Sequence, residues 1–175
     1  MYIMKNNFCL SLLGLLLVSL MFSCDKTDID FENDFEKSQK AWKAFKKSSG
    51  NSYKYTVVFS SWTGMHSETS IKVSNGKIIQ REYKYSKREN FTVIDELQWV
   101  ENENEINTHK SAGADPLTLD EIYTRAENDW LVKRDNATTY FEAENDGMIS
   151  SCGYVNDGCQ DDCFNGIKIS YIGIK

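Results

Sequence analysis

Asn75-Gly76 constrains the fold of this chain more than any other short feature. It separates two runs with strand character, one ending at Val73 and one beginning at Lys77. Both Asn and Gly accept the positive φ angles that a two-residue hairpin loop requires, so this pair between such runs is a strong hairpin signal. We therefore expect an antiparallel pair of strands on either side of residues 75–76.

Strand patterns occupy much of the remaining chain. Apolar and polar residues alternate, or short apolar runs occur, in segments 53–59, 91–94, 97–100, 130–133, 138–143, 148–154 and 167–174. Asn145-Asp146-Gly147 has turn composition, and the polar stretch Glu101–Ala114 is predicted to be a loop. Strands that follow one another through turns are typical of an antiparallel meander.

Two segments have helical patterns. In the first, apolar or small residues recur at helical spacing and lysines occupy much of the remainder; the recurring residues are Phe31, Phe35, Ser38, Trp42 and Phe45. In the second, Thr118 and Glu121 form a capping box ahead of a short helix. We expect the first helix to pack on the sheet, with a membrane surface as the alternative. The prediction is an α+β fold: an antiparallel β-sheet meander with an N-terminal amphipathic helix and a second short helix on one face.

The N-terminus has the pattern of an export signal. A short segment with the single charge of Lys5 precedes an apolar run, Phe8–Phe22, that is too short and interrupted for a spanning helix. The run ends before Ser23-Cys24 and resembles the lipobox of Bacteroidetes-type lipoproteins, although Phe22 is bulkier than usual there. The resemblance implies cleavage after residue 23, a diacylglycerol thioether on Cys24, and location at the outer membrane, periplasmic or surface-exposed.

Acidic residues dominate the segment after Cys24 and the chain as a whole. The density of like charge predicts a solvated tether over residues 24–33, followed by one domain at 34–175. The chain has 26 acidic and 20 basic residues, and no basic stripe, which excludes nucleic acid as the expected partner. The hydrophobic share of 41% is typical of a folded protein.

Three cysteines remain in the domain: Cys152, Cys159 and Cys163. Export favours oxidation, and a hairpin turning at residues 156–158 would set Cys152 nearly opposite Cys163. We expect that pair to form the disulfide. A zinc site is the alternative, but the spacing matches no standard ligand pattern, so no metal or other cofactor is expected.

Residues with catalytic potential are few and scattered. His66 and His109 both fall in polar, loop-like stretches without a nucleophile pattern. The carboxylate pairs Asp95-Glu96 and Asp161-Asp162 are adjacent in sequence, which on a strand places them on opposite faces. Trp62 and His66 are the candidate residues of a binding loop, and partial burial of Trp62 is the alternative.

The pattern also resembles a family of small secreted bacterial domains of unknown function. The resemblance rests on Trp42, Tyr53-x-Tyr55, the Asn75-Gly76-Lys77 hairpin, the helix 119–123 and Asp161-Asp162. Cys163 departs from the acidic residue that often follows the aspartate pair. The resemblance implies a fold over about residues 34–174 and no activity.

Three functions are compatible with these features. We expect a non-enzymatic, lipid-anchored binding or interaction module. The alternatives are an inhibitor or immunity-type lipoprotein, and an envelope hydrolase that uses carboxylates the sequence does not identify.

Overall fold

The structure is a computed structural model that describes residues 28–110 and 112–174. The predicted signal peptide, Cys24 and the first part of the predicted tether lie outside the described residues. Ile29 already pairs with Val132 in an isolated bridge and packs against the core. The folded domain therefore begins before the expected boundary at residue 34, because an apolar side chain within the acidic run has a place in the core.

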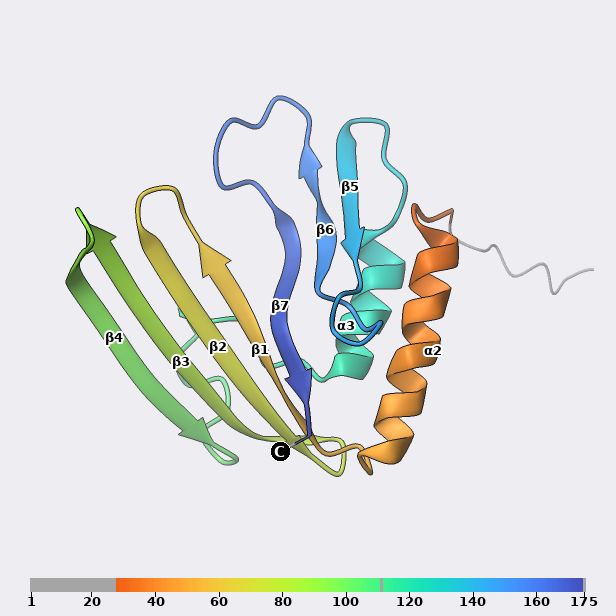
Figure 1. The fold of residues 1–175 in the computed structure, drawn as a ribbon, viewed down its shortest axis with the longest axis horizontal. Helices are drawn as coiled ribbons and strands as arrows, with labels where there is room; N and C mark the ends of the chain where they lie inside the picture. Colours follow the sequence, from red (N-terminus) through yellow and green to blue (C-terminus); the bar gives the residue numbers. More distant parts are fainter. Residues whose placement is uncertain (1–27, 111, 175) are drawn as a thin grey trace, which may run out of the picture.

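The described residues form a seven-stranded antiparallel sheet with helices on one face, which confirms the predicted α+β fold (Figure 1). The elements in chain order are α2 (Glu32–Ser48), β1 (Tyr53–Ser60), β2 (Met65–Ser74), β3 (Lys77–Glu89), β4 (Thr92–Asn102), α3 (Leu119–Arg125), the π-helical turn η1 (Ala126–Trp130), β5 (Ala137–Glu142), β6 (Ser151–Asn156) and β7 (Asn165–Gly173). The strand order is β4-β3-β2-β1-β7-β6-β5. The last strand thus lies inside the sheet, between β1 and β6, and joins two meanders.

The β2–β3 hairpin turns at the predicted position. Ser74 pairs with Lys77, and the two loop residues Asn75 and Gly76 have φ angles of 50° and 79°. Two successive positive φ angles match the twist of the flanking strands. The Asn75-Gly76 prediction is confirmed.

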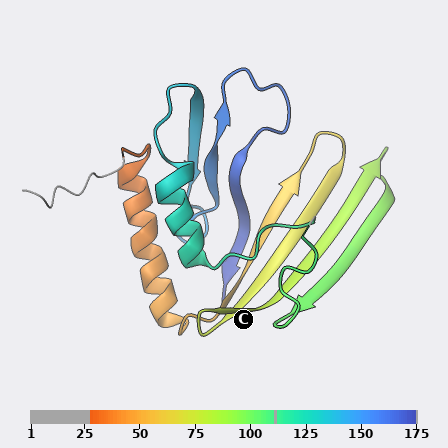
Figure 2. The same cartoon turned by 180° about the vertical axis from the view of Figure 1, so that it is seen from behind.

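Helix α2 packs beside α3 on the same face of the sheet (Figure 2). Its residues Phe35, Ser38 and Trp42 are buried. Ser38 shares a hydrogen bond of 2.7 Å with the hydroxyl of Tyr123, and the indole N–H of Trp42 donates to Asp120 at 3.0 Å. The middle of the predicted face is therefore a core face and Phe45 is partly buried, whereas Phe31 is the exposed N-cap residue rather than part of the helix. Most of the lysines lie on the outside, and Lys46 pairs with Asp120 of α3.

Two predictions about the strands are wrong. Segments 91–94 and 97–100 are one continuous strand, β4, which extends to Asn102. Segment 130–133 is no strand, because the chain continues from α3 into η1 and buries Trp130 there. The capping box of α3 is present as predicted, with Thr118 and Glu121 bonding each other's backbone N–H.

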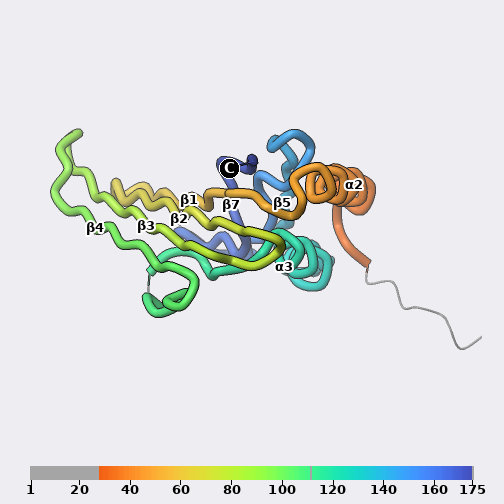
Figure 3. Tube along the Cα trace, turned by 90° about the horizontal axis from the view of Figure 1, so that it is seen from below, coloured from red at the N-terminus to blue at the C-terminus, as the bar shows by residue number. Residues whose placement is uncertain are grey.

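The sheet has a helix face and an open face. The helix face carries α2, α3 and, beside them, the segment 103–118, while the open face is on the other side (Figure 3). Two tyrosines of β1 bond the end of the segment 103–118 and the start of α3, which cover this face. The Tyr53 hydroxyl accepts from the N–H of Leu119 at 2.9 Å, and the Tyr55 hydroxyl donates to the carbonyl of Leu117. The covering segment is therefore fastened to β1, the central strand of the seven-stranded sheet.

Candidate functional site

The segment 103–118 covers only part of the helix face of β1–β4. Residues that pair across these strands form three successive rows: Tyr55, Ile71, Arg81 and Glu101; then Val57, Thr69, Tyr83 and Trp99; then Phe59, Ser67, Tyr85 and Leu97. The first row is buried. Gly113 lies against Thr69 and Tyr83 of the second row. No described segment covers the third row, in which Phe59 and Leu97 are exposed.

Glu101 fastens the covering segment to the sheet. Its fully buried carboxylate accepts hydrogen bonds from Arg81 at 3.2 Å and from the backbone N–H groups of Asn107 at 2.7 Å and His109 at 2.6 Å. Burial alone raises the pKa of Glu101, but these hydrogen bonds outweigh it and lower the pKa from 4.5 to about 2. We call this group, with Thr108, the Glu101 latch.

Arg81 of β3 also binds the covering segment. Its side chain is 2% exposed and donates to the carbonyls of Ala112 at 2.8 Å and Ala114 at 3.0 Å as well as to Glu101. The ring of His109 stacks on Trp99 at 4.4 Å and bonds Glu101 through Nδ1 at 3.1 Å. His109, expected to be an ordinary loop histidine, therefore helps to anchor the cover.

Beyond the latch, large apolar side chains are exposed at one end of the sheet. We call Phe59, Trp62, Tyr85, Phe91 and Leu97 the distal apolar surface. Trp62 is 79% exposed in the β1–β2 turn, and Phe91 is fully exposed in the β3–β4 turn. Tyr85 is only half-buried. Exposed aromatic and aliphatic groups that gather at one place are typical of interaction sites.

Backbone contacts hold the two hairpin tips together. The N–H of Arg88 in β3 donates to the carbonyl of Gly64 in the β1–β2 turn at 3.0 Å. Gly64 has a φ of 84°, and a Cβ at this position would collide with the carbonyl oxygen of Arg88. Trp62 and Phe91 thus belong to two turns that are joined and positioned by the sheet.

The two predicted binding residues have different outcomes. Trp62 is exposed as the binding-loop prediction requires, and the alternative of core burial is wrong. His66 is in β2 rather than in a loop, and it pairs with Ser60, so its side chain faces the open side, opposite to Phe59. Its Nδ1 lies 2.9 Å from the Ser60 hydroxyl. The His66 side chain therefore lies on the other face of the sheet from Phe59, in a hollow of about 550 Å³ that Tyr85 and Leu97 also line.

The predicted disulfide Cys152–Cys163 is wrong. The structure pairs Cys159 with Cys163, with Cα atoms 6.3 Å apart, and leaves the Cys152 thiol free in the core. The β6–β7 register sets Cys152 opposite Ile167, because the connection between the strands is longer than the two- or three-residue turn that was assumed. Burial raises the pKa of the Cys152 thiol to about 12.

The carboxylate pairs do not converge. Asp95 pairs with Lys87 and Glu96 with Ser86, so the two lie on opposite faces as predicted. Asp162 accepts a hydrogen bond of 2.9 Å from Ser61, which links the β6–β7 connection to the β1–β2 turn. Within residues 28–110 and 112–174, no group of three or more His, Cys, Asp or Glu side chains is arranged to hold a metal ion.

Comparison of the chain with protein-family models, with curated protein sequences and with solved structures gives no match. The two resemblances noted in the sequence therefore stay predictions. Across the part of the chain that the structure describes, no helix combines the length and apolar character needed to span a bilayer.

Proposed function

We propose that this chain is a non-enzymatic binding module, attached to the outer membrane through a lipid on Cys24, that holds a protein partner at the distal apolar surface. The single observation behind the binding role is the exposure of Trp62 and Phe91 at two joined hairpin tips. Folding leaves these rings in water, where each exposes apolar area that a partner would bury.

The size and composition of this surface suit the centre of a protein–protein interface. Each large aromatic side chain can bury roughly 150–250 Å². Phe59, Trp62, Phe91 and Leu97 together supply much of the apolar core of a standard interface, which takes about 800 Å² from each partner. Tryptophan in particular is enriched among the residues that dominate binding energy.

The attachment point favours a partner at the same membrane. Asp28 is four positions after Cys24, and a fully extended chain spans about 14 Å over that separation. In Figure 1 the start of α2 and the β3–β4 turn are both on the upper side of the domain but at opposite ends of its long axis. A lipid on Cys24 would therefore keep the domain near the bilayer, within reach of other membrane-bound proteins.

Chemical crosslinking in native membranes, followed by pulldown of the lipid-anchored chain, tests the proposal. Trp62→Ser with Phe91→Ser should weaken recovery of the partner about 30-fold or more, which corresponds to the 2 kcal/mol or more typical of a dominant interface residue. Tyr171→Ser is the matched control, because Tyr171 is an exposed aromatic residue near the opposite end of the sheet. Equal recovery with all three proteins would contradict the proposal.

A further inference from the structure

Strands β1 and β7 pair over only part of their length. Their register runs from Lys54 opposite Gly173 to Val57 opposite Ile169, and it shifts between Thr56 and Val57. The shift leaves Ser170 as an extra residue in β7, and such a bulge bends a strand and increases its twist. Beyond Val57 the two strands diverge, as Figure 1 shows. The sheet is thus split between β1 and β7.

Both edges of the split present backbone groups. The N–H of Ser61 donates to the carbonyl of Met65, toward β2. In an antiparallel ladder the backbone N–H and C=O groups of successive residues point alternately to the two neighbouring strands. Val58 and Ser60 therefore direct their N–H and C=O groups into the split. On β7, the N–H of Ile169 donates to Ser150 in the β6 direction. Lys168 and Gly166 therefore face the split from the other side.

The split is hollow on each face of the sheet. A hollow of about 510 Å³, the outer hollow, lies on the open face, and one of about 370 Å³, the inner hollow, lies on the helix face. Both are lined by Val58, Phe164 and Lys168. Gly113 and Ala114 of the covering segment line the inner hollow. The hydrogen bond between Ser61 and Asp162 links the connections that flank the split.

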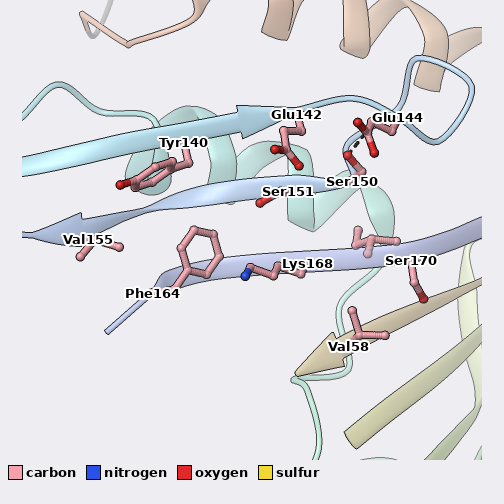
Figure 4. A pocket seen from close by; sticks show the side chains of 11 residues that line it. Val58, Tyr140, Glu142, Glu144, Ser150, Ser151, Val155, Phe164, Lys168 and Ser170 are labelled. Carbon is pink, nitrogen blue, oxygen red and sulfur yellow. Dashed lines mark hydrogen bonds between the residues drawn. The ribbon is translucent and has the colours of Figure 1, made fainter. Parts of the chain in front are cut away.

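The outer hollow carries charge and aromatic surface (Figure 4). Glu142, Ser151 and Lys168 form one row across β5, β6 and β7. Figure 4 shows Glu144 next to Ser150 at one end of the hollow, and Tyr140 and Phe164 on its other side. Within residues 28–110 and 112–174, neither Glu142 nor Glu144 forms a salt bridge.

From these observations we infer that the split binds an extended peptide segment that carries a basic side chain. The peptide backbone pairs with Val58 and Ser60 on one edge or with Gly166 and Lys168 on the other, which is recognition by strand addition. Its Lys or Arg side chain lies over the open face and pairs with Glu142 and Glu144. A free strand edge supplies the affinity, and the two carboxylates select the sequence.

This site is separate from the distal apolar surface apart from Phe59, which lines the inner hollow. Its test is therefore independent of the proposed function. Trp62→Ser should leave peptide binding unchanged, and loss of partner recovery in that variant says nothing against the split.

Fluorescence anisotropy with the purified full-length chain tests the inference. The probe is a fluorescein-labelled, amidated heptapeptide of alternating Thr and Val with one central Arg. We expect saturable binding that falls about tenfold when the central Arg is replaced by Glu, and about tenfold when alternate peptide nitrogens are methylated. Tenfold corresponds to about 1.4 kcal/mol, which is within the range of the hydrogen bonds that each change removes. Glu142→Gln with Glu144→Gln should reproduce the loss seen with the Glu peptide, whereas Glu127→Gln, on the exposed side of η1, should not.

Val58→Pro examines the β1 edge from the protein side, because the N–H that it removes points into the split and makes no bond to β2. If this variant does not fold, the methylated peptide still tests whether the peptide backbone pairs with the strand edge, since it leaves the protein unaltered. Undiminished binding of the methylated peptide would overturn strand addition. No binding of the Arg peptide, or pairing of two copies of the chain through the split in sedimentation, would overturn the inference as a whole.

Discussion

The Glu101 latch makes the sharpest prediction about stability. Glu101→Gln keeps the size of the side chain but removes its charge, and it places an amide N–H₂ against donors from Asn107 and His109. The pKa difference between 4.5 and about 2 corresponds to about 3 kcal/mol at roughly 1.36 kcal/mol per pKa unit. Removal of one partner from a buried ion pair typically lowers stability by about 3–5 kcal/mol.

We expect the lower end of that range, about 3 kcal/mol, because Arg81 still donates to the carbonyls of Ala112 and Ala114. The assay is urea unfolding at pH 7, with hydrogen exchange at Asn107 and His109 as the local readout. Glu103→Gln is the matched control, since its exposed pair with Lys77 should contribute less than about 1 kcal/mol. A loss below about 1 kcal/mol in Glu101→Gln, with normal exchange at both amides, would refute the latch.

The same carboxylate sets a pH dependence. Because the pKa of Glu101 is lower in the folded chain than in the unfolded one, the unfolded chain takes up the proton first as the pH falls. Its contribution to the free energy of unfolding is fully present above about pH 5 and is lost as the pH falls toward 2. In Glu101→Gln this component of the acid dependence should be absent.

The remaining predictions concern the core, the cysteines and the anchor. Trp42→Ala should lower the free energy of unfolding by about 3–5 kcal/mol, whereas Lys40→Ala on the exposed side of α2 should change it by less than about 0.5 kcal/mol; equal effects in urea titrations would contradict a core role for Trp42. Mass spectrometry of the unreduced chain should find Cys159 joined to Cys163, and a Cys152–Cys163 peptide would contradict the structure. Cys24→Ala should abolish the incorporation of radiolabelled lipid, and labelling that persists would contradict lipidation at Cys24.

Local signals in the sequence were enough for most of the fold. Asn75-Gly76 and the Thr118–Glu121 capping box each determine structure through neighbouring residues, and both are present as predicted. The buried side of α2 followed from helical spacing for the same reason. By contrast, the place of β7 between β1 and β6 depends on pairing between strands that are distant in sequence, which no local pattern encodes.

The candidate site was harder to predict because its parts come from separate hairpins. Trp62 stood out as a large aromatic residue in a polar stretch, but Phe91 was assigned to a strand although Asn90 before it is a turn residue with a φ of 49°. Glu101 was predicted only as the start of a loop and Arg81 was not singled out, since burial of a charged pair requires the covering segment to be in place. The disulfide prediction failed on register, which a shift in loop length changes without any change in the strands.

Site-specific photocrosslinking in living cells would show whether the distal apolar surface contacts a partner protein. A photoreactive benzoyl-phenylalanine would replace Trp62 in one strain and Tyr171 in another, both within the full-length, lipid-anchored chain. We expect a discrete adduct with a membrane-associated protein from position 62 and none from position 171. No adduct from position 62, or the same adducts from both positions, would contradict that expectation.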